Sequence, residues 1–233
     1  MADNTALVVG ASRGIGLGLV KELAGRGWNV IGTRRSASSD RGLEDFASSS
    51  DGKVRLESVD IEDPDSIDAM VGRLKGEELD LVFVNAGISG SHSPAATMSR
   101  DEVAQVFMTN SVGPVHLAES LKDQVRDGGV IAVMTSGLGS VASDFSFMGG
   151  GANLYSASKA ALNKMTRGFT STLGERRLTV LCMSPGWVRT DMGGPDAWID
   201  VDESAKGVID VVEAKAGTGQ HGFYGHDGKA LPW

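Results

Sequence analysis

The chain is poor in cysteine and has no long apolar run. Its 233 residues include one cysteine, Cys182, which excludes an intrachain disulfide and a cysteine-rich zinc site. No apolar stretch approaches the roughly 18 residues of a membrane-spanning helix, and no basic-then-apolar leader precedes the strand-like run at 5–9. We therefore expect a protein of the reducing cytoplasm with no membrane partner.

Positive charge is scarce as well. The chain has 22 Lys and Arg against 30 Asp and Glu, which gives a formal net charge of -8. Nucleic-acid binding needs a basic face, so we expect no nucleic-acid partner. The 4 histidines show no metal-ligand spacing such as HExxH, so no metal site is expected. An acidic chain that binds an anion must gather its arginines locally.

Short β-rich runs alternate with longer segments whose apolar residues recur every three to four positions. The predicted strands are 6–9, 28–33, 53–59, 79–84, 130–134 and 178–183, and the predicted helices are 14–26, 64–74, 100–125, 153–173 and 202–214. This alternation predicts an α/β fold, a doubly wound parallel sheet of the Rossmann type with helices on both faces. The length suits one core, so we expect a single domain over 1–233. Predicted core residues are Val8, Leu19, Val20, Leu23, Val82 and Val133.

The 32 glycines are about twice the usual share of about 7%, and several cluster after the first predicted strand. Glycines at a strand-to-helix junction let a pyrophosphate approach the free N–H groups of the helix start. A plain glycine-rich turn is the alternative. The candidate cofactor-binding residues of this loop are Gly10, Ser12, Arg13, Gly14, Ile15 and Gly16.

The same loop also matches the nucleophile elbow of serine hydrolases, Gly10-x-Ser12-x-Gly14. That elbow normally lies in mid-sheet, with strands and an oxyanion loop before it, whereas only nine residues precede Gly10. A hydrolase would need His221 or His226 as its base. The hydrolase interpretation is therefore the weaker one.

The second predicted strand ends in Thr33-Arg34-Arg35, without the acidic residue that holds ribose hydroxyls in NAD-preferring folds. Arg34 or Arg35, joined by Arg13, has the planar guanidinium that suits a 2'-phosphate. Solvent-exposed arginines are the alternative. This pattern predicts that NADP(H) is preferred over NAD(H).

Polar residues follow two further strands and begin a helix. Asn85-Ala86-Gly87 and Ser136 each come directly after a buried strand, and Tyr155 and Lys159 lie one turn apart on one face of a predicted helix. A lysine ammonium near a phenol stabilises the phenolate. Each motif alone also fits an ordinary turn or an exposed pair.

In this order, the motifs resemble the classical short-chain dehydrogenase/reductase family, and the resemblance covers essentially the whole chain. Asp60 after the third strand, Asn110 in the long predicted helix, and Pro185-Gly186 before Val188-Arg189-Thr190 also carry it. The short length and the ending at 228–233 are similar to the carbonyl-reductase-like branch that includes C-factor and sniffer proteins.

The resemblance implies that Tyr155 is the proton donor, that Lys159 lowers its pKa and holds the nicotinamide ribose, and that Ser136 binds the substrate oxygen. Asn110 would hold a water that joins Lys159 to solvent. The other implied cofactor-binding residues are Asp60 for the adenine amino group, Ile61 beside it, Asn85, Ala86 and Gly87 for the ribose, Pro185 and Gly186, and Val188 and Thr190 for the carboxamide.

The implied activity is NADPH-dependent reduction of an aldehyde or ketone to an alcohol, or the reverse, by hydride transfer with a tyrosine proton donor. The expected partner is a small carbonyl or alcohol substrate with an apolar part. A dinucleotide-binding regulatory or signalling protein with incidental turnover is the second interpretation. The resemblance leaves a homodimer or a homotetramer open.

Two glycine-rich loops, at 136–151 and 184–200, follow predicted strands and are the candidate substrate walls. Ser136 and Tyr155 are 19 positions apart, which exceeds the spacing of compact family members, with 144–151 as the extra material.

The roles of several apolar side chains in these loops stay open. Phe145, Phe147 and Met148 either cover the reacting carbon or pack elsewhere. Trp187 and Trp198 either line the pocket or anchor the second loop. Cys182, in an apolar strand, is predicted to be an inert core thiol.

Overall fold

A computed structural model describes residues 4–35, 40–143 and 153–233. Seven strands form one parallel sheet in the order β3-β2-β1-β4-β5-β6-β7. The strands are β1 (Thr5–Val9), β2 (Asn29–Arg34), β3 (Val54–Ser58), β4 (Leu79–Val84), β5 (Val125–Met134), β6 (Thr179–Ser184) and β7 (His221–Gly225). The predicted Rossmann-type α/β fold is thereby confirmed.

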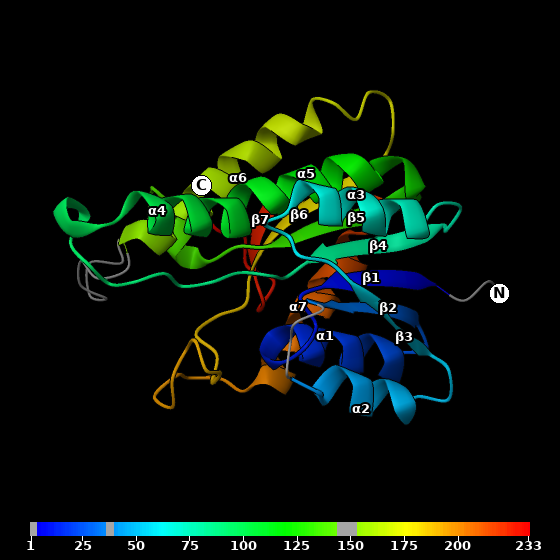
Figure 1. The fold of residues 1–233 in the computed structure, drawn as a ribbon. Coiled ribbons are helices and arrows are strands. Elements are labelled where there is room, and N and C mark those ends of the chain that lie inside the picture. The colour runs from blue at the N-terminus through cyan, green and yellow to red at the C-terminus, as the bar shows by residue number, and fades with distance from the viewer. Residues whose placement is uncertain (1–3, 36–39, 144–152) are drawn as a thin grey trace.

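Helices cover both faces of the sheet. They are α1 (Gly14–Gly25), α2 (Gly42–Ser48), α3 (Pro64–Arg73), α4 (Arg100–Phe107), α5 (Gly113–Leu121), α6 (Asn153–Thr170) and α7 (Val201–Lys215). In Figure 1, α1, α2 and α7 lie below the sheet and α3, α5 and α6 lie above it. None of the helices in the described ranges is long and apolar enough to cross a membrane.

Each face of the sheet has its own core, because successive strand residues point to opposite faces. Leu7 and Val9 of β1 belong to the core under α3, α5 and α6, whereas Ala6 and Val8 belong to the core under α1, α2 and α7. The residues predicted for the core are all buried: Val8, Leu19, Val20, Leu23, Val82 and Val133. The sulfur-bearing side chain of Cys182 is buried too, as predicted.

The long helix predicted over 100–125 is wrong in the structure. It is divided into α4, a π-helical turn at Met108–Val112, α5 and a short 3-10 turn, and β5 already begins at Val125. Pro114 has no N–H to donate to the carbonyl of Asn110, so the regular α-helical ladder is interrupted there. Gly113 is required beside it, since a Cβ at this position would lie 2.1 Å from the Ile61 carbonyl oxygen.

One α-helix and one strand were not predicted. The short helix α2 follows β2, and β7 pairs in parallel with β6 from Val180–His221 to Ser184–Gly225. β7 matters for the site, because its carboxyl end adds a further loop to the edge of the sheet at which the other parallel strands also end.

Candidate active site

A cleft of about 920 Å³ lies at the carboxyl ends of the strands and gathers nearly all the predicted site residues. Of those residues, the cleft is lined by Gly10, Ser12, Arg13, Gly14, Ile15, Arg34, Arg35, Asp60, Ile61, Asn85, Ala86, Gly87, Ser136, Tyr155, Lys159, Pro185, Gly186, Val188 and Thr190. Gly16 and Asn110 do not line it. Both are buried, and both hold segments that do line it.

The glycine loop packs so tightly against the end of β4 that side chains are excluded. Gly10 has φ of +81°, and a Cβ there would lie 2.8 Å from the Ala86 backbone. The Asn85 side-chain amide donates to the Gly10 carbonyl at 2.9 Å, and a Cβ at Gly16 would lie 2.0 Å from that same oxygen. The start of α1 is thereby left open for close approach of a phosphate.

The hydrolase alternative gains no support from this geometry. No described hydrogen bond joins Ser12 to a histidine. His221 instead contacts Arg167 and Cys182, at 3.5 Å and 3.9 Å, and does not line the cleft. His226 lies against Gly186, where a Cβ would be 3.0 Å from its ring. The described part of the chain also contains no cluster of three side chains that could hold a metal ion.

The three arginines proposed for the 2'-phosphate line the cleft, and carboxylates pair with two of them. Arg34 Nε lies 2.6 Å from Glu44 Oε1 of α2. Arg13 Nη1 lies 2.8 Å from Asp191 Oδ2, and its Nε lies 3.6 Å from Asp40 Oδ2. A guanidinium carries five N–H donors, and these ion pairs fix the orientation of Arg13 and Arg34 at the cleft. Arg35 is exposed and also lines the cleft.

Ser136, which follows β5, and Tyr155 of α6 form a hydrogen bond between their side chains. Ser136 follows β5 and caps a 3-10 turn by accepting a hydrogen bond from the Leu138 N–H at 3.2 Å, which fixes its position. Burial raises the pKa of the Tyr155 phenol to about 12, although its hydrogen bond with Ser136 acts in the opposite direction. The phenol is therefore protonated at neutral pH, as a proton donor must be. The predicted insertion at 144–151, with Phe145, Phe147 and Met148, lies outside the described residues.

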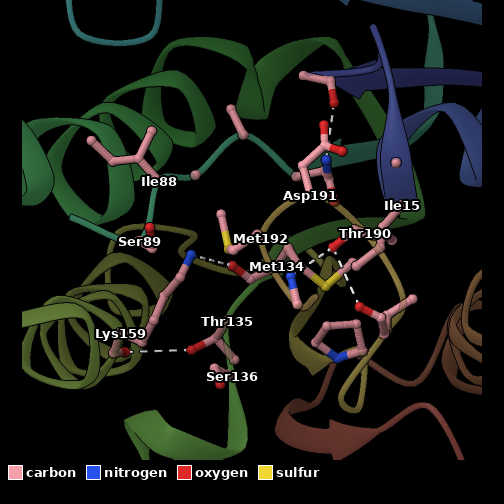
Figure 2. Close-up of a pocket in the computed structure, with 18 of the residues that line it drawn as sticks. Ile15, Ile88, Ser89, Met134, Thr135, Ser136, Lys159, Thr190, Asp191 and Met192 are labelled. Carbon is pink, nitrogen blue, oxygen red and sulfur yellow. Dashed lines mark hydrogen bonds between the residues drawn. The ribbon is translucent and has the colours of Figure 1, made fainter. Parts of the chain in front are cut away.

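Lys159 lies one helical turn beyond Tyr155 and is only 2% exposed. Its ammonium donates to the Met134 carbonyl at 2.8 Å (Figure 2). The same ammonium lies 5.7 Å from the centre of the Tyr155 ring. Burial lowers the pKa of Lys159 to about 8. That Lys159 lowers the pKa of the phenol stays a prediction.

Asn110 lies in the π-helical turn and is completely buried. Its amide nitrogen donates to the Ile88 carbonyl and to Ser158 Oγ at 2.8 Å and 2.9 Å, and its oxygen accepts from the Ile88 N–H at 2.8 Å. Asn110 thus fixes the chain that follows β4. A Cβ at Gly87 would lie 3.3 Å from both Asn110 Oδ1 and Lys159 Nζ, so glycine keeps the space between these two groups open.

Comparison with known proteins decides the family. Residues 4–197 match the family model described as short chain dehydrogenase. The chain belongs to the short-chain dehydrogenase family. Its members include NAD(P)-dependent oxidoreductases, and this chain is an enzyme of that type with a likeness to carbonyl reductases.

Three relatives place the chain within the short-chain dehydrogenases. A short-chain dehydrogenase/reductase of Burkholderia multivorans with bound NADP is 37% identical, with a TM-score of 0.95 and 100% of both chains covered. A carbonyl reductase of Pseudomonas aeruginosa PAO1 in complex with NADP is 36% identical, with a TM-score of 0.91 and 100% of both chains covered. The C-signal of Myxococcus xanthus is 32% identical over 66% of this chain and 93% of its own. The carbonyl-reductase-like branch is thereby confirmed.

Several residues of this short-chain dehydrogenase were missed by sequence reasoning. Asp227 and Leu231 line the cleft from the loop after β7, together with His226, which the sequence had suggested only as a hydrolase base. Their signal was the run His221–Gly225, which is short, rich in aromatic residues and glycine, and could have been recognised as a seventh strand. Both roles considered for Trp187 and Trp198 are observed, since the two residues line the pocket and also contact each other and the loop.

The lowered pKa of Lys159 predicts a pH dependence for this short-chain dehydrogenase. The ammonium loses its proton as the pH rises through about 8, so we expect kcat/KM for NADPH to be constant below that pH and to fall above it. The pH profile of initial rates measures this, together with NADPH affinity at each pH. Lys159→Arg keeps its charge and should move the fall to higher pH. A wild-type profile that stays flat through pH 8 would contradict the prediction.

Proposed function

We propose that this short-chain dehydrogenase reduces an aldehyde or ketone to an alcohol with NADPH, or catalyses the reverse, and that residues 1–233 act as a single dinucleotide-binding and catalytic domain. The observation that supports this most is the convergence of Ser136, Tyr155 and Lys159 on one cleft, which the glycine loop also lines. The NADP-bound carbonyl reductase of similar fold supports the same reaction class.

The cleft fits a dinucleotide. The cradle between Gly10, Gly16 and Ala86 admits no side chain, which is the arrangement that a pyrophosphate at a helix start requires. Asp60 and Ile61 would hold the adenine end, Asn85 to Gly87 and Lys159 the nicotinamide ribose, and the segment 185–190 the carboxamide. When bound, NADPH supplies the hydride that the protein cannot provide.

The side chains of the chain itself manage the developing charge on the substrate oxygen. Hydride addition to a carbonyl carbon leaves an oxyanion, which needs hydrogen-bond donors and a proton. The Ser136 hydroxyl would donate a hydrogen bond to that oxygen, and the Tyr155 hydroxyl would transfer its proton to it. The Lys159 ammonium would stabilise the resulting phenolate, and Asn110 would act by positioning the segment at Ile88 and a water that leads to solvent.

The arginine cluster supports a preference for NADP(H) over NAD(H). We expect Arg34→Ala and Arg35→Ala each to weaken NADPH binding by about 1.5 to 3 kcal/mol, roughly ten- to a hundredfold, because a charge-assisted contact with the 2'-phosphate is lost. NADH binding should hardly change. Titration of both nucleotides measures this. Arg41→Ala is the matched control, since Arg41 lies nearby but does not line the cleft. Equal affinities for the two nucleotides in the wild type would contradict the proposal.

A turnover assay tests the proposed reaction. Oxidation of NADPH is followed with a panel of aldehydes and ketones, and the alcohol product is identified. A second candidate is a dinucleotide-binding regulator with incidental turnover, favoured by the relative that is named C-signal. Tight NADPH binding without turnover of any carbonyl compound would favour the regulator, whereas product formation that depends on Tyr155 would favour the enzyme.

A further inference from the structure

Part of the exposed apolar surface of the described chain lines the cleft. Seven large apolar side chains are exposed in the described chain, and three of them belong to the loop after β6: Trp187, Met192 and Trp198, at 37%, 52% and 70%. All three also line the cleft. Apolar surface that stays in water and gathers in one place usually marks a binding site.

Trp187 and Trp198 form an aromatic pair. Their ring centres lie 5.4 Å apart and the ring planes are inclined by 67°, so the contact is edge to face. The Trp187 indole N–H donates to the Gly193 carbonyl at 2.8 Å, which fixes its ring. Backbone N–H groups of Trp198 and Ile199 donate to the Trp187 carbonyl at 3.1 Å and 3.2 Å and join the two ends of the loop.

Ion pairing also holds this loop in place. Arg189 Nε lies 2.6 Å from Asp200 Oδ1, and its Nη1 donates to the Ala197 carbonyl at 2.6 Å. The pair of tryptophans is therefore held by contacts within the loop and needs no ligand to assemble. A rigid aromatic surface loses little conformational entropy when something binds to it.

The occupant of this surface follows from the rest of the cleft. The two tryptophans line the same cleft as Ser136 and Tyr155, so a substrate whose carbonyl lies at Ser136 and Tyr155 occupies the cleft that the tryptophans also line. Indole rings and the thioether of Met192 make their most favourable contacts with another aromatic ring. We propose that the substrate is an aryl aldehyde or aryl ketone whose ring packs on the Trp187–Trp198 pair, an inference that rests on the proposed carbonyl reduction.

The test compares two aldehydes of similar size, benzaldehyde and cyclohexanecarbaldehyde, of which only the first is aromatic. Their kcat/KM ratio is measured in the wild type, Trp198→Phe and Trp198→Leu. Because the intrinsic reactivities of the two aldehydes are the same for every variant, they cancel when ratios are compared. We expect the ratio to fall about fivefold in Trp198→Leu, mainly through KM of benzaldehyde, and to be largely retained in Trp198→Phe.

Trp233→Leu provides the matched control. Trp233 is 44% exposed and packs on His221 and Phe223, but it does not line the cleft. This variant should keep the wild-type ratio. A second measurement avoids turnover: benzaldehyde should quench tryptophan fluorescence in the Tyr155→Phe variant with NADP⁺ bound, and Trp198→Leu in that background should weaken the binding.

The outcomes separate this inference from the proposed function. Failure to reduce any aldehyde or ketone would refute carbonyl reduction itself. Reduction with an aryl preference that Trp198→Leu leaves unchanged would refute only the aromatic site. A change of sedimentation coefficient in Trp198→Leu, with an unchanged ratio, would show that the tryptophans contact a second copy of the chain and would likewise refute the inference.

Discussion

Tyr155→Phe is expected to bind NADPH as the wild type does and to reduce carbonyl compounds at least roughly 10²- to 10⁴-fold more slowly, the range that positioned acid–base catalysis usually supplies. The substitution removes only the hydroxyl. The ring, α6 and the glycine loop remain, so the groove for the nucleotide is unchanged. Single-turnover hydride transfer at saturating NADPH isolates the chemical step from nucleotide binding.

Because the pKa of Tyr155 is raised, we expect reduction and alcohol oxidation to depend differently on pH. With the phenol protonated up to about pH 12, reduction has its proton donor across the neutral range. Alcohol oxidation needs the phenolate and should accelerate as the pH rises. Ser136→Ala serves as the comparison, because it removes the hydrogen bond to the substrate oxygen and leaves the proton donor. Near wild-type hydride transfer in Tyr155→Phe would show that another group donates the proton.

Lys159→Ala is expected to lose both catalysis and nucleotide affinity. Its ammonium is the buried cation beside the phenol, and the proposed mechanism also gives it the nicotinamide ribose. Loss of a charge-assisted hydrogen bond should weaken NADPH binding by roughly tenfold or more, and the rate should fall by at least the factor expected for Tyr155→Phe. Binding titrations and single-turnover rates measure the two losses separately.

Two controls show whether these losses come from chemistry or from packing. Lys164→Ala removes an exposed lysine from the same helix and should leave both quantities unchanged. Lys159→Met fills most of the buried volume without the charge, so it should behave as Lys159→Ala does while keeping a melting temperature close to that of the wild type. Wild-type NADPH affinity in Lys159→Met would contradict the role assigned to the ribose.

Periodicity predicted most of the fold because the strands are buried on both faces and the helices on one. The continuous apolar runs at 81–84 in β4 and 130–134 in β5 and the striped pattern of α1 leave little choice of structure. The segment before β5 was predicted as one helix because its apolar residues keep a helical spacing over 100–125. Only Gly113 and Pro114 indicate that this helix is broken. β7 was missed because two of its five residues are glycine.

The sequence predicted which residues form the site, but it did not predict their burial, their hydrogen bonds or the pKa values that follow from these. Motif order along parallel strands brings Asn85, Ser136 and Tyr155 to one edge of the sheet, which needs no knowledge of packing. The pKa of Tyr155 depends on how deeply its hydroxyl is buried and on where the Lys159 ammonium finds its hydrogen bond. Those contacts come from Met134 and from the close packing of Gly139 on α6, neither of which has a signal in the sequence.

The π-helical turn at Met108–Val112 amounts to one residue inserted into an otherwise ordinary helix. Deleting a single residue there would remove this insertion while Pro114 still interrupts the ladder, and would rotate Asn110 relative to α5 by about 100°, the turn of one helical residue, away from Ile88. The chain after β4 would then lose its anchor. Chain length at this point is therefore under stricter constraint than the identity of most residues in it, and insertions or deletions here should be much rarer than substitutions among related enzymes.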